Sequence, residues 1–435
     1  MREVKKNDKK KKNKKNSFSY KLKKIFHYIH DTLFDEDDNE CEKARFSIYE
    51  VIGIIMLSIF FGIVIGYLLV VSRESVSSYN PNLSEIINTY SDIKRNYYDK
   101  IDEEKLKDGA IKGMVESLDD EYSSYMDSSL SNSFSESVNG SYVGIGVTVA
   151  FVDEHYVIVE VFPNSPADKA GIKVDDILLR VNGKNVLDLS NDEFLNSFHG
   201  KVNSKIDVTI MRNEKEKTYH LKRTNIEENV VNTSVFSIND KNVGYIKLSS
   251  FSSYSFNQFS NALNELEKEG ITSLIIDVRD NLGGHLLQTR QILSLFFKKS
   301  VVLYQMESKG KNKKIYSMNN DNRDYPVYVL INHNSASASE ILASCFMENY
   351  KNSYIVGETS YGKGTVQKTT KISNGKSIKY TTQKWLTSNG NWLNGVGVNP
   401  DVVVVQDSNY YENPSYDNDF VLQRTFDIIK EKGFN

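Results

Sequence analysis

The segment SLIIDVRDNLGGHLLQTRQILSLFF, residues 273–297, sets the architecture of this chain. Its first six residues, SLIIDV, form an almost continuous apolar run, which is typical of a strand buried on both faces of a sheet. The next six, RDNLGG, are rich in turn-forming residue types and predict a loop. The remainder, HLLQTRQILSLFF, predicts a helix. The segment therefore indicates a buried strand that leads through a glycine-rich loop into a helix.

The same order of strand and helix recurs on both sides of this segment. Before it, VGYIKLSSF (243–251) predicts a strand, and FNQFSNALNELEKEG (256–270) predicts an amphipathic helix ending in glycine. After it, VYVLIN (327–332) predicts a strand and SASEILASCFMENY (337–350) a helix. This alternation implies an α/β core with a largely parallel sheet covered on both faces. Chemistry is then expected at the carboxyl ends of the strands, where RDNLGG and NSASASE lie.

Two further regions precede this core. Residues 83–130 place apolar side chains at spacings of three and four, which predicts helices. From about Gly140 to Arg223 the chain carries a series of short strand signals, interrupted by SPADKAGI, a short helix with Pro166 in its first turn. This second region is expected to be a compact module of mainly β structure.

An uncharged run, VIGIIMLSIFFGIVIGYLLVV, covers residues 51–71. A helix of that length is long enough to cross the hydrocarbon core of a bilayer. The alternatives are a buried core helix, which would normally show a polar face, and a cleaved signal peptide, which would lie closer to the N-terminus. We therefore expect a retained membrane anchor. The lysine-rich head should stay in the cytoplasm under the positive-inside rule, with residues 73–435 outside.

The composition is that of an ordinary globular protein. The 435 residues allow two or three domains, and 39% of them are hydrophobic and 26% charged. Two cysteines cannot form a disulfide framework. The net charge of −3 conceals an asymmetry, because residues 1–24 carry 12 Lys and Arg against 2 acids, whereas residues 73–435 carry 40 against 47. Attraction to anionic lipid headgroups explains the basic head more simply than nucleic-acid binding does.

The motif NSASASE, residues 334–340, has three serines at every second position. On local spacing alone, Ser337 and Glu340 form a capping box at the start of the predicted helix. A serine at a helix N-terminus that follows a strand is also well placed for nucleophilic attack, because the first amides of the helix and its dipole face the developing negative charge. Both interpretations stand on these residues alone.

A nucleophilic serine needs a base, and three residues qualify. His285 follows the glycine loop, His333 precedes the serines, and Lys363 lies in GETSYGKGTVQ. A lysine acts as a base when burial lowers its pKa. Residues 357–363 also match most of a phosphate-binding loop, but Gly364 stands where Ser or Thr is required and a β-like sequence follows. Nucleotide binding is therefore not expected.

From about Leu83 to Val405 the chain resembles the carboxy-terminal processing proteases, also called tail-specific serine proteases. Five motifs occur in the order of that family's protease core: GYIKLSSF, IIDVRDNLGG, NSASASEI, GETSYGKGTVQ and TTQKWLTSNGNWLNGVGVNPDV. The β module, with SYVGIGVTV and VFPNSPADKAGIKVDDILLRVNGK, is similar to the family's PDZ domain, and the helices before it resemble its N-terminal region. Each motif alone is weak, but five in register are highly specific.

The resemblance implies a set of catalytic residues. The family's nucleophile falls on Ser337, its lysine base on Lys363, and the glutamine that orients the lysine on Gln367. The family's oxyanion donors fall on the backbone amides of Gly283 and Ala338. Under this interpretation Ser335 and Ser339 are neighbours of the nucleophile, without a catalytic role.

The resemblance also implies a binding partner. The amides of Gly144, Ile145 and Gly146 are expected to hold the terminal carboxylate of a peptide, so the partners are protein or peptide substrates with free C-termini. No metal and no organic cofactor is implied. Membrane lipids are expected to contact the anchor and the basic head, no nucleic-acid partner is expected, and a homo-oligomer stays open.

The predicted fold class is α/β in a multidomain α+β arrangement, with a transmembrane helix, a PDZ β module and a βα-sandwich, crotonase-like serine protease core. The expected divisions are a cytoplasmic basic head with an acidic patch (1–47), the transmembrane helix (48–72), an N-terminal helical region (73–135), the PDZ domain (136–225), the protease core (226–410) and a C-terminal helical tail (411–435).

The predicted function is that of a membrane-anchored serine endopeptidase that cleaves extracytoplasmic proteins with a Ser–Lys dyad and reads their C-terminal tails through the PDZ domain. One alternative is a Ser–His hydrolase that uses His285 or His333. Another is a PDZ scaffold without catalytic activity that captures protein C-termini at the membrane.

Overall fold

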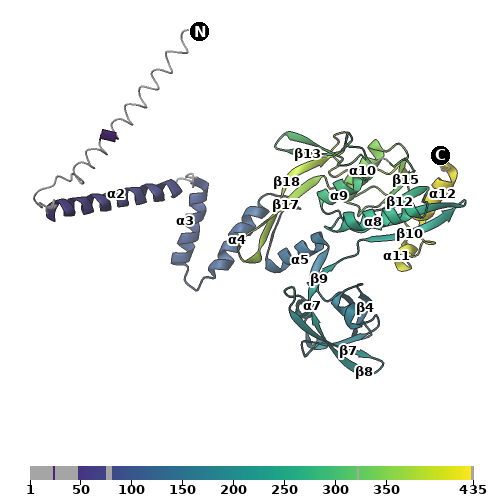
Figure 1. Ribbon diagram of the computed structural model, residues 1–435, viewed down its shortest axis with the longest axis horizontal. Helices are drawn as coiled ribbons and strands as arrows, with labels where there is room; N and C mark the ends of the chain where they lie inside the picture. The colour runs from purple at the N-terminus through teal and green to yellow at the C-terminus, as the bar shows by residue number, and fades with distance from the viewer. Residues whose placement is uncertain (1–22, 25–47, 75–80, 321–322, 433–435) are drawn as a thin grey trace, which may run out of the picture. The chain divides into compact units, whose positions relative to one another are not determined.

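The computed structural model in Figure 1 describes residues 23–24, 48–74, 81–320 and 323–432. Apart from residues 23–24, the predictions for the basic head and the acidic patch (1–47) lie outside the described residues. The chain divides into two units, Met1–Ile101 and Asp102–Asn435.

In the first unit the described residues include the helices α2 (Ile48–Glu74) and α3 (Pro81–Asn96). The uncharged run of the sequence lies within α2, where the side chains of Phe60 and Ile63 are more than half exposed. Among the residues that the structure describes, no helix combines the length and the apolar character needed to cross a membrane. The predicted transmembrane helix over 48–72 is therefore not confirmed.

The second unit begins with helices that frame a short strand: α4 (Glu103–Glu116), β1 (Ser124–Met126) and α5 (Ser128–Asn139). Aspartates cap both helices, because Asp102 accepts a hydrogen bond from the backbone of Lys105 and Asp127 accepts one from Leu130. Gly140 ends α5 in the left-handed conformation, with φ of 63°. Helices thus occur where the apolar spacing predicts them.

The β module follows α5. Its main sheet has the strand order β3-β4-β5-β7-β8 with β6 paired to β5, and its remaining two strands, β2 and β9, pair with each other. All of these pairings are antiparallel. Its elements are β2 (Ser141–Gly144), β3 (Val147–Val152), β4 (His155–Val161), α6 (Pro166–Ala170), β5 (Ile177–Val181), β6 (Lys184–Asn185), η1 (Val186–Asp188), α7 (Asn191–Phe198), β7 (Lys205–Arg212), β8 (Lys215–Lys222) and β9 (Thr224–Glu227).

The core of the unit is a six-stranded sheet in the order β10-β11-β12-β15-β16-β19. Only β10 and β11 pair antiparallel, and every later neighbour is parallel, as the alternating sequence predicts. The strands are β10 (Val231–Ile238), β11 (Lys241–Leu248), β12 (Ser273–Asp277), β15 (Val327–Ile331), β16 (Ser353–Gly357) and β19 (Val402–Val403).

A second, antiparallel sheet accompanies the first. It has the order β1-β18-β13-β14, and β17 also pairs with β18. Strand β1 comes from the N-terminal region and is more than 250 residues away in sequence from its partner, with Ser124 opposite Lys379. Besides β1, the strands are β13 (Val302–Ser308), β14 (Lys311–Tyr316), β17 (Thr365–Lys371) and β18 (Ser377–Leu386), and η2 (Ser373–Gly375) lies between the last two.

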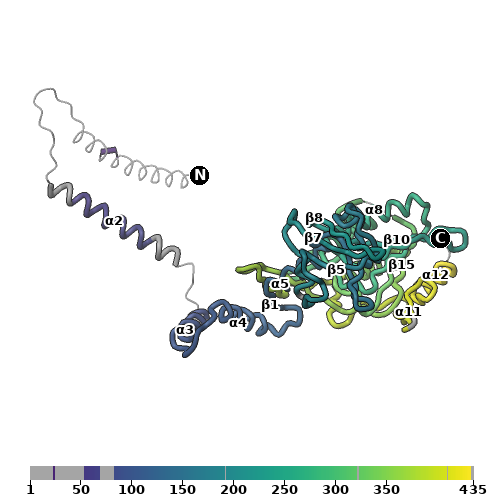
Figure 2. The backbone as a smooth tube through the Cα atoms, turned by 90° about the horizontal axis from the view of Figure 1, so that it is seen from below, coloured from purple at the N-terminus to yellow at the C-terminus, as the bar shows by residue number. Residues whose placement is uncertain are grey.

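Helices cover both faces of the parallel sheet. On one face, α8 (Ser255–Lys268), α9 (Leu286–Leu293) and α10 (Ala338–Asn349) pack against Ile246, Ile276 and Val329. On the other face, α12 (Phe420–Lys432) packs against Tyr245, Ile275 and Tyr328. Figures 1 and 2 both place α12 beside β10 and β15, and the short helix α11 (Ser408–Glu412) precedes it. The two central strands, β12 and β15, are accordingly buried throughout.

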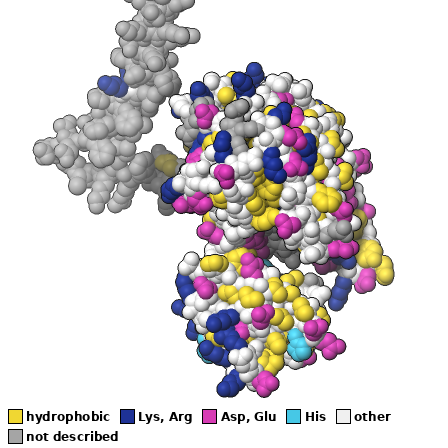
Figure 3. Space-filling model, turned by 90° about the vertical axis from the view of Figure 1, so that its right-hand side faces the viewer, with side chains coloured by type: hydrophobic (Ala, Val, Ile, Leu, Met, Phe, Trp, Pro, Cys, Tyr) yellow, Lys and Arg dark blue, Asp and Glu magenta, His cyan; other side chains and the backbone are white. Residues whose placement is uncertain are grey.

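The parallel register brings three loops to one edge of the sheet. Asp277, the last residue of β12, lies opposite Leu330, and Ile331, the last residue of β15, lies opposite Gly357 at the end of β16. The loops after these strands therefore start side by side. On the face shown in Figure 3, side chains of both charge signs are interspersed over the surface.

Candidate active site

The serine loop between β15 and α10 is tied to the glycine loop after β12. Ser335 Oγ donates to the carbonyl of Val278 at 2.8 Å, and Ser339 Oγ donates to the carbonyl of Asn281 at 2.8 Å. Both of these serines are fully buried. Ser337, in contrast, is half-buried and lines a cleft of about 970 Å³. Two of the three serines thus hold the loop, and the third faces the space that a substrate can enter.

Ser337 stands immediately before α10 in an unusual backbone conformation, with φ of 54° and ψ of −106°. A non-glycine residue with positive φ is uncommon and costs energy, so the surrounding contacts must hold it. One such contact is the hydrogen bond from the Ser337 N–H to Glu340 Oε2 at 2.7 Å. The strained serine sits where the positive end of the helix dipole would favour negative charge.

Gly283 and Ala338, the two predicted oxyanion donors, lie close together. A side chain on Gly283 would meet the carbonyl of Ala336 at 2.9 Å and the nitrogen of Ala338 at 3.0 Å, and the φ of Gly283 is 104°. Only glycine allows this approach. The Gly283 N–H, however, donates to Asn281 Oδ1 at 2.9 Å, so it is already engaged inside the loop. Ala338 begins α10, where N–H groups have no partner within the helix.

Lys363, the predicted base, lies in the loop that connects β16 to β17. Its backbone N–H donates to Glu340 Oε2 at 2.9 Å. Its side-chain nitrogen stands 4.6 Å from the centre of the Tyr122 ring, and within the described part of the chain it forms no hydrogen bond or ion pair. Burial, helped by the charge of Lys379, lowers the pKa of Lys363 below its usual value. A lowered pKa favours the neutral amine that a base requires.

Gln367 lies on β17 and lines the same cleft, but its side chain is bound elsewhere. Its Nε2 donates to Thr365 Oγ1 and to Thr381 Oγ1, both at 3.0 Å. The structure therefore brings Ser337, Lys363 and Gln367 to one cleft without linking their side chains.

The two candidate histidines differ in their surroundings. His333 is mostly exposed and lies 3.5 Å from a carboxylate oxygen of Glu358. His285 lines the cleft, burial lowers its pKa, and its Nε2 is buried with no hydrogen-bond partner among the described residues. Of the two, only His285 shares a cleft with Ser337.

The predicted carboxylate-binding loop lies at the end of β2. Gly144 pairs with Thr224 of β9, and the side chain of Ile145 is buried in the core of the β module. Gly146 has φ of 81°, and a side chain there would collide with Ser165. Glycine is thus required at this position by the backbone itself, and the binding of a carboxylate stays a prediction.

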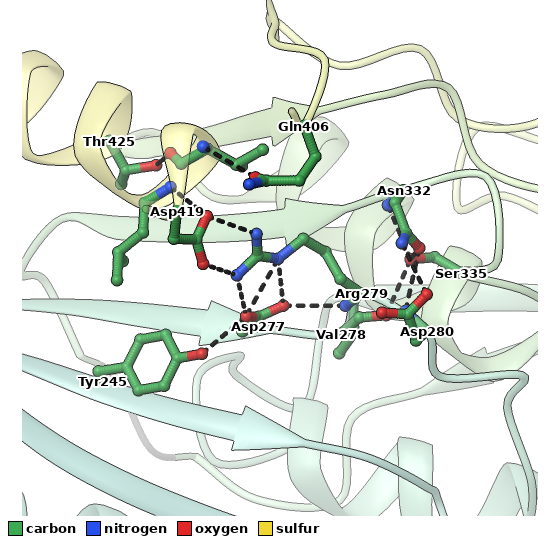
Figure 4. Close-up of polar contacts among 12 residues, drawn as sticks. Tyr245, Asp277, Val278, Arg279, Asp280, Asn332, Ser335, Gln406, Asp419 and Thr425 are labelled. Carbon is green, nitrogen blue, oxygen red and sulfur yellow. Dashed lines mark hydrogen bonds and ion pairs between the residues drawn. The ribbon is translucent and has the colours of Figure 1, made fainter. Parts of the chain in front are cut away.

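A buried charge network lies where β12 ends (Figure 4). Arg279 forms ion pairs with Asp277 at 2.6 Å and with Asp419, just before α12, at 2.7 Å. Burial alone would raise the pKa of Asp277, but Arg279 and the hydroxyl of Tyr245 hold that pKa below its usual value. Asp280, which follows Arg279 in the chain, accepts hydrogen bonds from the side chains of Asn332 and Asn334. These two asparagines lead into the serine loop.

Sequence reasoning missed three residues of this site. The sequence indicates only a helix cap at Glu340, yet this residue also binds residues 358–364, the loop between β16 and β17 that is called the lysine loop below. Asn281 Oδ1 accepts a hydrogen bond from the N–H of Gly283, and the amine of Lys363 lies over the ring of Tyr122. The spacing of SASE signals the cap, but no local pattern signals the other contacts.

Comparison with known proteins identifies the parts of the chain. Residues 242–404 match Peptidase family S41, residues 143–222 match a PDZ domain, and residues 69–129 match the N-terminal domain of the activating protease CtpB. The chain is 38% identical over 348 residues to the carboxy-terminal processing protease CtpB of Bacillus subtilis (strain 168), covering 79% of this chain and 72% of that one. It is 36% identical to the carboxy-terminal processing protease CtpA of the same organism, covering 77% and 71%.

A solved structure, the photosystem II D1 C-terminal processing protease, aligns with a TM-score of 0.43 at 24% identity and covers 73% of this chain and 92% of that one. The identities to the two Bacillus subtilis proteases, each over more than two thirds of the relative's length, establish the family. The chain belongs to the carboxy-terminal processing proteases and is a serine-type peptidase with a PDZ domain.

Proposed function

We propose that this protein is an endopeptidase that works with a Ser–Lys dyad formed by Ser337 and Lys363. The observation that carries this proposal is a shared hydrogen-bond acceptor. The backbone N–H groups of Ser337 and Lys363 both donate to Glu340 Oε2, at 2.7 and 2.9 Å, so the two residues are held side by side. The lowered pKa of Lys363 supports its role as the base.

In the proposed reaction, Ser337 Oγ attacks the scissile carbonyl and its proton passes to the neutral amine of Lys363. The protonated Lys363 then gives that proton to the leaving amine, and water releases the acyl group from Ser337. The N–H groups of Ala338 and Gly283 stabilise the oxyanion, for which the Gly283 N–H must first leave Asn281. The amine of Lys363 must likewise leave the ring of Tyr122, and its flexible side chain allows this.

Full-length protein incubated with an unfolded protein substrate tests this activity. Mass spectrometry should detect internal cleavage products with the wild type and none with Ser337→Ala. If both proteins are inert but bind substrate tails equally, the scaffold alternative is correct.

We further propose that the PDZ domain selects substrates by their free C-termini. This prediction concerns Gly144, Ile145 and Gly146. Gly146 supports it through a positive φ of 81° and a position against Ser165 that leaves no room for a side chain. Amidation removes the terminal charge, and each hydrogen bond to a charged group contributes about 1.5–3 kcal/mol. Substrate with a free C-terminus should therefore be cleaved faster than its amidated form, and equal rates would exclude tail reading by this domain.

We also propose that the protease acts outside the cytoplasm, held at the membrane by α2 and by contacts of the basic head with lipid. The support is the uncharged run of 21 residues at 51–71 together with the exposed apolar side chains of Phe60, Ile63 and Leu68. Protease added to intact cells should then digest residues 73–435 and spare the head. Protection of residues 73–435 would exclude this orientation.

A further inference from the structure

Glu340 is a completely buried carboxylate that is surrounded by hydrogen-bond donors. It lies in the first turn of α10 and is 0% exposed. A buried charge normally requires a cation or a full set of hydrogen bonds. Within the described chain no lysine or arginine forms an ion pair with Glu340, so the hydrogen bonds must stabilise its charge.

Four donors surround the two carboxylate oxygens. Oε1 accepts from Ser360 Oγ at 2.7 Å and from the N–H of Gly362 at 2.6 Å. Oε2 accepts from the N–H of Ser337 at 2.7 Å and from the N–H of Lys363 at 2.9 Å. Three of the four donors belong to the lysine loop and one to the serine loop. Glu340 is therefore a direct link between the two loops.

We propose that Glu340 is the positioning residue that sets the separation between the nucleophile and the base. It fixes the backbone of Ser337 in its strained conformation and holds the backbone of Lys363 beside it. This inference rests on the dyad proposed above, since it assigns a role to the residue between the two members of that dyad.

Only a carboxylate of this length meets the requirement. Ionised glutamate presents acceptors at both oxygens and no donor, which matches four donors. Glutamine would turn an NH₂ group toward two of those donors and lose both bonds. Aspartate keeps the charge and the acceptors, but its side chain is one CH₂ shorter and cannot reach both loops at once. The two substitutions thus separate the charge of Glu340 from its reach.

The charge of Glu340 also acts on Lys363. Lys363 is faced by charged groups from three parts of the chain and by one ring. The charged groups are Lys379 on β18, Glu340 on α10, and Asp120 and Glu121 in the segment before β1, and the ring is that of Tyr122. The three carboxylates favour the ammonium form of Lys363, whereas burial and Lys379 favour the neutral amine. Removing the charge at residue 340 should therefore lower the pKa of Lys363. The acidic limb of the kcat/KM profile, where activity is lost as Lys363 becomes protonated, should move to lower pH.

The test compares full-length Glu340→Gln and Glu340→Asp with the wild type and with Glu348→Gln. Glu348 is a matched control, because it lies on the same helix and its carboxylate accepts from Ser388 Oγ and from the N–H of Asn389, away from the cleft. The measurements are kcat, KM, the pH dependence of kcat/KM and thermal unfolding. Labelling of Ser337 by a fluorophosphonate, located by peptide mapping, reports separately on the dyad.

We expect Glu340→Gln and Glu340→Asp each to lower kcat by about 10²-fold, the size of effect expected when reacting groups are misplaced by about 1 Å. KM should change little, and Glu348→Gln should behave as the wild type. The acidic limb should move to lower pH in Glu340→Gln and stay in place in Glu340→Asp. If Glu340→Gln does not fold, the charge-conserving Glu340→Asp still tests the effect on kcat.

Two results would overturn the proposal. One is wild-type kcat in a folded Glu340 variant. The other is a lower kcat in Glu340→Gln with an unshifted acidic limb, because Glu340 would then serve only the fold. Failure of the dyad itself looks different, since Ser337 would then remain unlabelled in the wild type or would be labelled as fast in Lys363→Arg as in the wild type.

Discussion

The serine loop and the lysine loop meet at Glu340 but are held in different ways. In the serine loop, the side chains of Ser335 and Ser339 are buried and bound to the glycine loop. In the lysine loop the backbone is bound, but the amine of Lys363 rests on the ring of Tyr122. The loop of the proposed nucleophile is thus tied down by buried side chains, whereas among the described residues the amine of the proposed base has a ring contact and no hydrogen bond.

The difference has an origin in the fold. The serine loop follows β15, which lies between two parallel neighbours, so its backbone is confined on both sides. The lysine loop instead leads from the parallel sheet into the hairpin of β17 and β18. Strand β1 of the N-terminal region pairs with that hairpin and places Tyr122 nearby. The surroundings of Lys363, the proposed base, therefore depend on a segment that is distant in the sequence.

The largest effect is expected from removing either member of the dyad. Ser337→Ala and Lys363→Arg should each lower single-turnover cleavage at least about 10³-fold, and the double variant should be no worse, because the two residues act as a unit. Arginine keeps the charge and the approximate size but stays protonated, so it cannot replace a neutral lysine.

His285→Ala and His333→Ala are the controls for this prediction, and both should retain most of the activity, with folding checked by circular dichroism. Loss of cleavage in His285→Ala together with substantial activity in Lys363→Arg would assign the base to the histidine.

A smaller effect is expected from loosening the serine loop. Ser335→Ala removes a donor to the Val278 carbonyl and the acceptor of the Asn332 N–H, and both bonds are buried. Leaving such groups unpaired costs about 1–3 kcal/mol of stability. Urea unfolding should show this loss, and kcat should fall about 10-fold as the nucleophile shifts.

Ser344→Ala is the matched control. Ser344 is buried in α10, the helix that follows the serine loop, and among the described residues its hydroxyl bonds only to the carbonyl of Ile341 in that helix. Its stability and kcat should stay close to those of the wild type. A Ser335→Ala variant with unchanged stability would show that the serine loop is not held as described.

A change of a few-fold in kcat/KM is expected from replacing Tyr122, whose ring contacts the amine of Lys363. A cation over an aromatic ring gains about 0.5–1 kcal/mol, which favours the ammonium form of Lys363. Tyr122→Leu removes this contribution and keeps an apolar cover, so the pKa of Lys363 should fall further. Below that pKa, kcat/KM should rise about two- to five-fold, the same energy expressed as a rate. Tyr122→Phe keeps the ring and should leave the profile unchanged, and a shift as large as that of Tyr122→Leu would refute this role of the ring.

The smallest change in kcat is expected from altering the hydrogen bonds of the Gln367 side chain. Thr381→Val removes one of the two hydroxyls to which the side-chain amide of Gln367 donates. Freed from this partner, the amide can turn toward Lys363 and orient it. We expect kcat to rise about two-fold, the lower end of what one hydrogen bond contributes. A decrease in kcat would mean that the bond to Thr381 supports the active arrangement.

Much of the fold was predictable because it follows from local pattern. The apolar run before RDNLGG and the run before NSASASE predict the central strands β12 and β15, and the glycines predict the loops. The arrangement of the second sheet was not predictable, because the pairing of Ser124 with Lys379 has no local signal. Pairing across such a distance depends on which surfaces remain to be covered once the core has formed.

In the candidate site, likewise, some features could be predicted from local sequence and others could not. Ser337, Lys363 and Gln367 were found from motifs, and the structure brings all three to one cleft. The contacts of their side chains could not be found from motifs, because they involve partners distant in the sequence, such as Tyr122 for Lys363. The hydrogen bond from the Gly283 N–H to Asn281 Oδ1 also could not be predicted, because it depends on how the loop folds back. Motifs identified the residues, and only the fold revealed their hydrogen bonds.

The most direct test of the Ser–Lys dyad is the pH dependence of Ser337 acylation. A fluorophosphonate is added to the wild type and to Lys363→Arg between pH 5 and pH 10, and the labelled residue is identified by peptide mapping. In the wild type, label should appear on Ser337 at a rate that rises with pH through a single pKa below the usual lysine value of 10.5, because the neutral amine must take the proton. In Lys363→Arg the label should be absent at every pH. Labelling of Ser337 at the same rate and with the same pH dependence in both proteins would show that Lys363 is not the base.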